Sequence, residues 1–374
     1  MIFADPDRRI VYPGEYPQCQ QMNAQAKTGG RVGKKIRASG NRLTLNEVAE
    51  KVGVSPITIS RALNKPEKVS PGLRETILKI VEELGYVPDY AARALASRNS
   101  NTIGVLSSLL GTNIFPRVMK GIEDRARGTG LRIQYVNTRY DPDEELYQLR
   151  QFFAQKPTGI IIGGVQVDPR VTEMLHDAPC PVVQFIDISY PPVDMAIGIN
   201  NAAAADVAIR HLLDVGYHRI AFCSTGTDIP VRMRLESYRN RLREAGLYNP
   251  DLEVNVDAND CFGSAGKTLD TLFAADPEVD AVLCCHDDLA LGLLFECQRR
   301  GISIPDRLGL CSFTDLDYCA HTVPGLTTVR TPLYQLGYRA TDMIIRSQDK
   351  SRQKHTTDLG FELIARGSTR RPKP

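Results

Sequence analysis

Short apolar segments alternate with helical segments over most of this chain, and this alternation limits the folds open to it. From Thr102 onward, strand-like runs lie at 103–108, 131–137, 159–164, 181–187, 218–224, 280–286 and 308–313. Helical periodicity lies near 115–128, 142–155, 169–177, 230–246 and 288–300. Short apolar strands that alternate with helices are typical of parallel sheets covered on both faces. We therefore predict an α/β body made of two lobes, each with a parallel sheet.

Ligands of open parallel sheets bind at the carboxyl ends of the strands, so the cleft between the lobes is the predicted ligand site. The sequence carries no recognisable catalytic motif. Gly163-Gly164 is not followed by the residues of a nucleotide-binding loop, and no GxSxG motif occurs. Asp287 and Asp288 are adjacent and point in different directions, which makes them a poor acid–base pair. We predict that the protein is not an enzyme and uses no cofactor.

The nine cysteines indicate a reducing compartment rather than a disulfide framework, because no CxxC pair occurs. Neither they nor the six histidines have the spacing of a zinc site, so we predict no metal. No apolar run approaches the about 20 residues needed to cross a bilayer. The N-terminus also lacks the basic start and apolar core of a signal peptide. We therefore expect a cytoplasmic protein with no membrane partner.

Residues 43–64, LTLNEVAEKVGVSPITISRALN, have the pattern of two short helices joined by a tight turn. Gly53 supplies a residue that tolerates a positive φ at the end of the first helix. Ser55 and Pro56 suit the cap and the first position of the second helix. A third helix is predicted from Pro71 to Gly85. Residues 1–98 are also more basic than the rest of the chain, as expected of a DNA-facing end.

The second of these helices leaves a compact polar and apolar face outward, which suits the major groove of DNA. Arginine recognises guanine, apolar side chains contact the thymine methyl, and hydroxyls reach phosphates. The alternative is an ordinary pair of helices with a polar face. The predicted DNA-facing residues of this region are Thr44, Ser55, Pro56, Ile57, Thr58, Ser60, Arg61 and Asn64.

The stretch from Leu43 to about Leu106 resembles the LacI/GalR family of bacterial repressors. It carries the family's VA…GVS..T.SR.LN core, the ELGY.P close of the third helix and the A.R.L hinge. The resemblance implies a hinge helix at 91–97 that folds on the operator, with Leu95 entering the minor groove and Ala92 close to its symmetry mate. Asp89 departs from the family, which usually has asparagine there.

The resemblance and the sequence pattern together suggest a domain plan. We expect a disordered basic tail at 1–40, a helix-turn-helix domain at 41–88, a hinge and linker at 89–101, and an effector-binding and dimerisation body at 102–374. The tail is equally compatible with a passive extension. The family implies that 326–332 crosses back to the first lobe, that a helix at 333–347 packs there, and that a last strand near 360–365 returns to the second lobe.

The family also implies which residues of the body contact the effector. Asp287 corresponds to the position that bonds sugar hydroxyls, with His286 in place of the usual asparagine. Each position has a structural alternative: Asp287 as a helix cap, Arg234 as a surface residue, Phe115 as core, and Arg330 as an ion-pair partner. The predicted effector-binding residues are Asn113, Phe115, Arg234, Asp287, Asp315 and Arg330.

The run DDLALGLLFECQRRGISIP is most similar to the gluconate-utilisation branch of the family. Gluconate is a linear polyhydroxylated anion, whose carboxylate suits Arg234 or Arg330. The chain contains no tryptophan on which a sugar ring would stack. A 2-keto acid, idonate and a phosphorylated relative remain alternatives.

The resemblance predicts a homodimeric repressor of sugar-acid catabolism genes, whose partners are double-stranded operator DNA and a small sugar-acid effector. The body alone would also suit a sugar-binding receptor of the periplasmic type. A sugar-acid enzyme on the same body is a second alternative.

Overall fold

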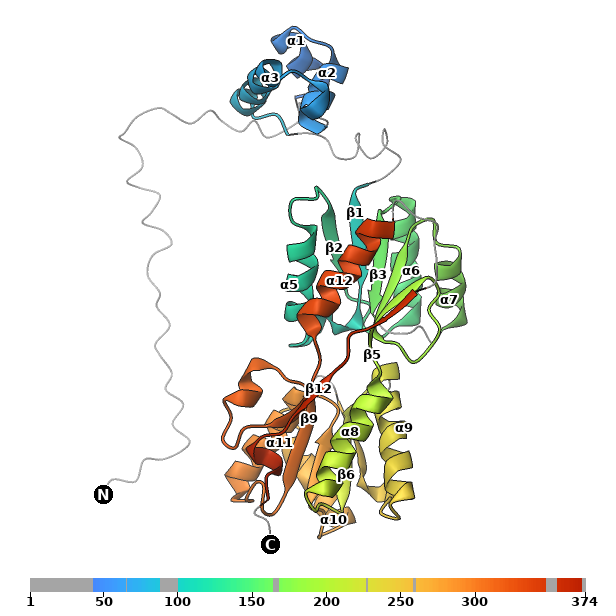
Figure 1. Cartoon of the computed structure of the whole chain (residues 1–374), viewed down its shortest axis with the longest axis vertical. Helices are drawn as coiled ribbons and strands as arrows, with labels where there is room; N and C mark the ends of the chain where they lie inside the picture. The colour runs from blue at the N-terminus through green and yellow to red at the C-terminus, as the bar shows by residue number, and fades with distance from the viewer. Residues whose placement is uncertain are drawn as a thin grey trace, which may run out of the picture. The chain divides into compact units, whose positions relative to one another are not determined.

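The computed structural model describes residues 43–64, 66–87, 100–163, 168–226, 228–257, 260–347 and 355–371. The chain divides into two compact units, Met1–Pro88 and Asp89–Pro374 (Figure 1). The predicted tail at 1–40 lies outside the described residues, and so do residues 89–99 of the predicted hinge. Among the described residues, no helix has the length and apolar character needed to span a membrane.

The first unit is a three-helix head, in agreement with the predicted fold. Its helices are α1 (Leu45–Val52), α2 (Pro56–Asn64) and α3 (Pro71–Leu84), with a 3-10 turn, η1 (Pro66–Lys68), before the last. Thr44 and Glu47 form a capping box at the start of α1, and Gly53 ends that helix with a φ of 78°. The buried side chains are those of Val48, Ala49, Ile59, Ala62, Ile77 and Tyr86.

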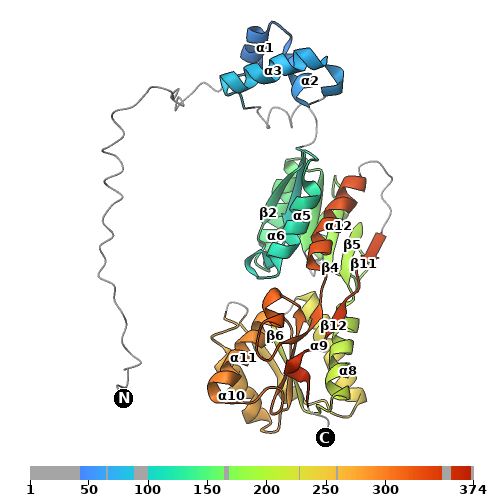
Figure 2. The same ribbon diagram turned by 60° about the vertical axis from the view of Figure 1, so that its left-hand side comes forward.

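The first lobe of the second unit contains a six-stranded parallel sheet in the order β11-β5-β4-β3-β1-β2. Its strands are β1 (Thr102–Leu106), β2 (Arg132–Val136), β3 (Gly159–Gly163), β4 (Val182–Asp187), β5 (Met195–Ile199) and β11 (His355–Asp358). The covering helices are α5 (Phe115–Ala126), α6 (Pro142–Ala154), α7 (Pro169–His176) and α12 (Leu333–Arg346). Side chains alternate along β3: Ile161 joins the core under α5 and α12, while Ile160 and Ile162 join the core under α6 and α7. Figure 2 shows α5 beside α12 in this lobe.

The second lobe repeats this arrangement in a sheet of order β12-β10-β9-β8-β6-β7, parallel except for the β10–β12 pair. Its strands are β6 (Ile220–Thr225), β7 (Glu253–Val256), β8 (Ala281–Cys284), β9 (Gly309–Thr314), β10 (Thr327–Arg330) and β12 (Glu362–Ile364). Its helices are α8 (Asn201–Asp214), α9 (Ile229–Glu244), α10 (Ala265–Ala275) and α11 (Asp287–Arg300), with short turns at η3 (Pro250–Leu252), η4 (Asp317–Ala320) and η6 (Gly367–Thr369).

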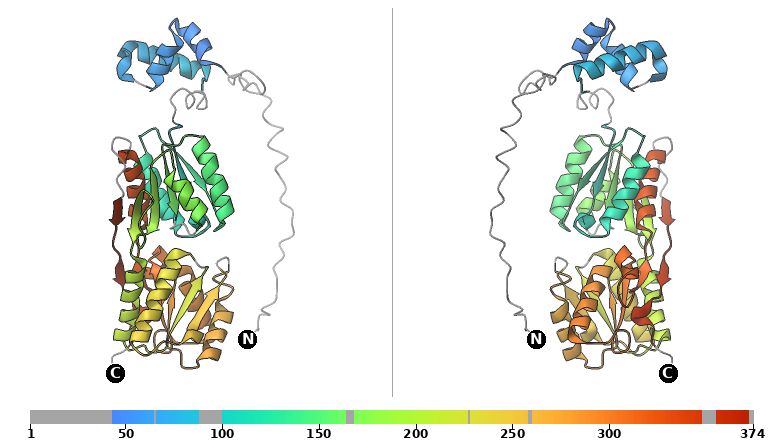
Figure 3. Two further views of the ribbon diagram at one scale, coloured as in Figure 1. Left: turned by 90° about the vertical axis from the view of Figure 1, so that its right-hand side faces the viewer. Right: turned by 90° about the vertical axis from the view of Figure 1, so that its left-hand side faces the viewer.

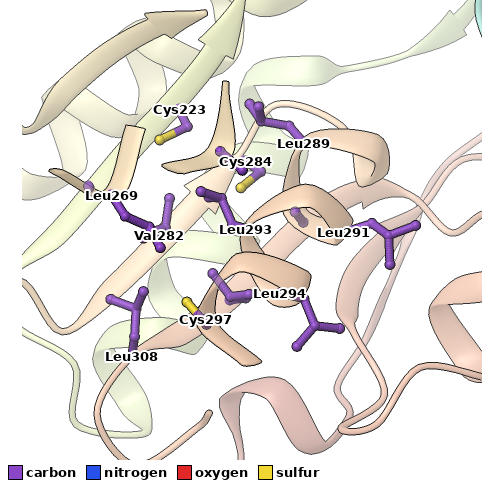
Figure 4. Packing of buried hydrophobic residues seen from close by; sticks show 14 of the residues in the cluster. Cys223, Leu269, Val282, Cys284, Leu289, Leu291, Leu293, Leu294, Cys297 and Leu308 are labelled. Carbon is purple, nitrogen blue, oxygen red and sulfur yellow. The ribbon is translucent and has the colours of Figure 1, made fainter. Parts of the chain in front are cut away.

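The cysteines of the described residues are free and buried, which confirms their interpretation as small apolar side chains. Cys223, Cys284 and Cys297 lie among leucines of α10 and α11 in the core of the second lobe (Figure 4). Burial raises the pKa of the Cys297 thiol to about 12, so this thiol stays protonated and unreactive near neutral pH.

The predicted path of the C-terminal segment between the lobes holds for α12 and β12. Figure 3 shows β11 in the first lobe followed directly by β12 in the second. The segment predicted to cross over at 326–332 begins instead as β10, which pairs with β9 in the second lobe and leaves it only after Arg330. The strands β5, β7 and β11 and the helices α8 and α10 were not predicted from the sequence.

Two helices far apart in the sequence, α5 and α12, cross with almost no space between their backbones. A Cβ atom on Gly121 would lie 2.1 Å from the carbonyl oxygen of Tyr334, and one on Gly337 would lie 2.0 Å from that of Val118. Because backbone atoms cannot yield as a side chain can, glycine is required on both helices. This crossing holds the start of α5, next to the interlobe cleft, in place.

We predict that Gly337→Ala lowers the free energy of unfolding of the body by about 1–3 kcal/mol, because the added methyl group overpacks this crossing. The midpoint of urea unfolding, followed by circular dichroism, measures the effect. Gly266→Ala is the matched control, since its methyl group would meet only the side chains of Glu296 and Arg300. Equal losses of stability in the two variants would contradict the prediction.

Candidate functional site

The outward face of α2 carries an exposed apolar side chain and an exposed arginine one helical turn apart. Ile57 is 62% exposed, which is unusual for isoleucine, and Arg61 is also exposed one turn further along the helix. The Ser55 hydroxyl accepts a hydrogen bond from the Thr58 backbone N–H at 3.2 Å and therefore caps α2. This face therefore combines an exposed apolar side chain, a guanidinium and the capping hydroxyl of Ser55 on one short helix.

The other predicted DNA-facing positions differ in what the structure says of them. Thr44 caps α1 through its hydroxyl, and its backbone N–H bonds the Glu47 carboxylate at 2.6 Å. Pro56 and Ser60 are half-buried on α2. The side chain of Asn64 lies outside the described part of the chain, and so do Ala92 and Leu95.

A cavity of about 1110 Å³ lies between the two lobes of the body. Segments that follow the carboxyl ends of the strands line it, as expected for open parallel sheets. From the first lobe come the loops after β1 and β2, with Ser108, Asn113, Asn137, Arg139 and Tyr140. From the second lobe come the starts of α8 and α9 and the turn between β8 and α11, with Asn201, Asp228, Arg232, Arg234, His286 and Asp288.

Arg234 lies in the wall of this cavity, where it is only 7% exposed. Its Nε and Nη2 atoms donate to Oδ1 of Asn201 at 3.0 and 2.7 Å, and Nη1 donates to the Cys285 carbonyl at 2.5 Å. The guanidinium also lies 4.3 Å from the ring of Phe313. These partners carry no formal charge, and none of the ion pairs among the described residues includes Arg234. Burial lowers the pKa of this guanidinium, and Cys285 and Asp228 act in the opposite direction.

Asp287, a predicted effector contact, does not line the cavity. It is 0% exposed, and its carboxylate accepts hydrogen bonds from the backbone N–H of Leu316 and from three hydroxyls. The hydroxyl donors are Ser312 at 2.5 Å, Thr314 at 2.7 Å and Thr328 at 2.8 Å. Burial raises the pKa of the Asp287 carboxyl, while these hydrogen bonds favour the carboxylate. Its acceptor sites are occupied within the protein, so this residue joins α11 to β9 and β10.

Three further predicted effector contacts also point elsewhere. Arg330 pairs with Asp315 at 2.7 Å and with Glu362 at 3.1 Å, and Arg366 pairs with the other oxygen of Asp315 at 2.8 Å. Neither Arg330 nor Asp315 lines the cavity. Phe115 is core, 2% exposed and packed edge-on against Tyr135 with ring centroids 5.8 Å apart. These positions correspond to the structural alternatives of ion-pair partner and core residue.

Asn113 and Arg234 are the predicted effector residues that do line the cavity. Asn113 donates from Nδ2 to Oδ1 of Asp288 across the cleft at 3.0 Å. Asp288 and His286 lie beside Asp287 in sequence and line the cavity, but they were not among the predicted effector-binding residues. His286 Nε2 lies 2.7 Å from the Thr225 hydroxyl, while its buried Nδ1 atom has no hydrogen-bond partner among the described residues. The position of His286 and Asp288 directly after a predicted strand could have indicated that they belong to the site.

No group of histidine, cysteine and acidic side chains in the described part of the chain has an arrangement suited to a metal ion. A helix-turn-helix head joined to a two-lobed body with an interlobe cavity defines a class of DNA-binding transcriptional regulators. The comparison with known proteins agrees with this class.

Residues 44–89 match the model of "Bacterial regulatory proteins, lacI family", and residues 209–369 match a "Periplasmic binding protein-like domain". The "HTH-type transcriptional regulator GntR" of Pseudomonas aeruginosa is 35% identical over 337 residues, which cover 90% of this chain and 98% of that protein. The GntR of Escherichia coli is 32% identical over 87% of this chain and 98% of its own length. A LacI-family regulator from Silicibacter pomeroyi has a similar structure, with a TM-score of 0.78, 28% identity and coverage of 88% of this chain and 100% of that one.

The chain therefore belongs to the LacI family and is a DNA-binding transcriptional regulator rather than an enzyme. Its relatives match along almost their whole length, so the head and the body are shared together and not separately.

We predict that Asp287→Ala lowers the free energy of unfolding of the body by about 3 kcal/mol or more, because it leaves several buried donors unpaired. Thermal unfolding followed by circular dichroism measures this loss. Asp288→Ala is the matched control from the same helical turn, and we expect a change of less than about 1 kcal/mol because its side chain is only partly buried. Similar stability of the two variants would refute a structural role for Asp287.

Proposed function

We propose that this regulator is a repressor of sugar-acid catabolism genes that leaves its operator when a small sugar acid such as gluconate binds between the lobes. We further propose that it acts in the cytoplasm as a homodimer, because two heads are needed for the two half-sites of a near-palindromic operator. The observation that supports an acidic ligand is the position of Arg234. Its buried guanidinium lies in the cavity wall and has only neutral hydrogen-bond partners.

A buried charge without a direct ion-pair partner is costly, and a ligand carboxylate would reduce that cost by forming charge-assisted hydrogen bonds. Arg234 retains donors for this purpose, because its hydrogen bonds to Asn201 and Cys285 use one hydrogen on each of its three nitrogens, out of five N–H groups. Arg330, the other candidate for the carboxylate, already pairs with Asp315 and Glu362. This comparison favours Arg234 as the carboxylate partner.

The polyhydroxylated character of the ligand is supported by the rest of the lining. Amide, hydroxyl and acidic groups line the cavity together with Arg234, including those of Asn113, Asn137, Thr225 and Asp288. Such groups pair with the hydroxyls of a linear sugar acid more readily than with an apolar molecule. The similarity of the α11 segment to the gluconate-utilisation branch and the GntR relatives agree with this ligand.

Ligand binding changes operator affinity only to the extent that the ligand binds the two states differently, typically by about 1–3 kcal/mol of coupling free energy. We assign negative coupling, so that gluconate weakens operator binding. An increase in operator affinity on adding gluconate would contradict this assignment.

We predict that the wild-type protein binds gluconate in a calorimetric titration and discriminates against glucitol, the neutral polyol with the same number of carbons. Arg234→Gln should weaken gluconate binding by roughly 30-fold or more, because it removes one partner of a desolvated charge pair. Arg330→Gln is the matched control and should retain the wild-type affinity. Equal affinity for gluconate and glucitol would refute the acidic-ligand proposal.

We predict that Arg61→Ala weakens binding to a specific operator by roughly 5- to 100-fold, the value of a lost base contact, and leaves nonspecific binding much less affected. Fluorescence anisotropy with a duplex selected by the wild-type protein, and with a scrambled duplex, measures both affinities. Lys79→Ala, an exposed residue of α3, is the control for loss of positive charge alone. The same loss in the two variants would contradict a sequence-recognising role for Arg61.

A further inference from the structure

The cavity wall contains a carboxylate that the ion pairs of the second lobe leave without a counter-ion. Asp288 lies in the first turn of α11, half-buried and lining the cavity. Among the described residues, the neighbouring ion pairs engage Asp315 and Asp317, but not Asp288. Its negative charge therefore faces the same cavity as the positive charge of Arg234.

The hydrogen bonds of Asp288 gather on one of its two oxygens. Oδ1 accepts from the Tyr318 hydroxyl of its own lobe at 2.7 Å and from Asn113 of the opposite lobe at 3.0 Å. An ionised carboxylate accepts about four hydrogen bonds and donates none, so Asp288 retains capacity for ligand donors. A cavity with a cation at Arg234 and such an acceptor at Asp288 suits a ligand with an acid group and separate hydroxyl donors.

We propose that Asp288 recognises the hydroxyl groups along the chain of the acid, and that Asn113 is a positioning residue that brings the opposite lobe to the same carboxylate. This proposal rests on the proposed function, because it assumes that the acid group of the ligand lies at Arg234. It assigns to Asp288 the role that the sequence suggested for Asp287, whose acceptor sites are occupied inside the protein. It also joins ligand contact and interlobe contact at one side chain.

The test compares gluconate with xylonate and threonate, which are shortened by one and two hydroxylated carbons but keep the carboxylate. In wild-type protein, the affinity measured by calorimetry should fall along this series as hydroxyls are lost. Asp288→Asn should weaken gluconate binding by roughly 10- to 100-fold, the value of hydrogen bonds to a charged acceptor. Its affinity for threonate should stay near the wild-type value, so the dependence on chain length flattens.

Two control variants separate ligand recognition from positioning. Tyr318→Phe removes a hydrogen bond to Oδ1 but keeps the carboxylate, so the ratio of gluconate to threonate affinity should be retained. Asn113→Ala should weaken both acids by the same factor, because it removes the interlobe contact and not the acceptor. Thermal unfolding of each variant establishes that the body remains folded.

The outcomes distinguish this inference from the proposed function. Normal binding of the acids by the wild type, with an unchanged gluconate-to-threonate ratio in Asp288→Asn, would overturn the role of Asp288 alone. Failure of the wild type to bind any of the three acids would overturn both the proposed ligand and the inference built on it.

Discussion

The buried carboxylate of Asp287 is the interaction on which the geometry of the cleft depends. It connects the start of α11 to Ser312 and Thr314 of β9 and to Thr328 of β10. It also accepts from the backbone N–H of Leu316, at the beginning of η4. These hydrogen bonds hold the start of α11, the end of β9, the strand β10 and the start of η4 around one carboxylate. Because a carboxylate without partners is costly to bury, all of these donors are needed together.

The residues around this point owe their positions to it. Thr314, whose hydroxyl bonds Asp287, lines the cavity with a φ of 108°, a backbone conformation that β-branched residues rarely adopt. Such strain persists only where the surroundings determine it, and it is common at functional sites. The η4 turn positions Tyr318, whose hydroxyl donates a hydrogen bond to Asp288. Asp288 also accepts a hydrogen bond from Asn113 of the first lobe. A structural carboxylate thus supports a neighbouring carboxylate that is free to face the cavity.

Arg234 and Asp288 are two side chains of opposite charge in the lining of the cavity, which also includes Arg139, Arg232, Asp168 and Asp228. Each interacts with neutral partners in the protein, so each keeps its charge available at the surface of the cavity. This arrangement differs from the nearby cluster of Arg330, Arg366 and Asp315, in which opposite charges neutralise one another. The difference supports the proposal that Arg234 and Asp288 meet a ligand, whereas the ion pairs of Asp315 hold β10 and the C-terminal segment together.

The local elements were largely predictable, because they depend on short-range rules. The capping residues and Gly53 marked the first helix of the head, and alternating apolar runs marked strands such as β1, β3 and β6. The strand β7 was missed because it has only four residues, EVNV, and lies at the edge of the sheet, so it lacks the continuous apolar run that marks the buried strands. The helix-turn-helix pattern and the two-lobed body, which together identify the family, follow from this local information.

The sequence by itself determined the fold, the family and the place of the cleft, because periodicity and motif spacing are properties of neighbouring residues. Only the tertiary structure decided which side chains face that cleft. Asp287 and Asp288 are adjacent and identical in chemistry, yet successive residues of a helix point in directions about 100° apart. The direction that meets β9 and β10 depends on residues 25 to 41 positions away along the chain, as the hydrogen bonds from Ser312 and Thr328 demonstrate. Hydrogen bonds between residues so far apart in the chain are set by tertiary packing, and no local sequence pattern predicts them.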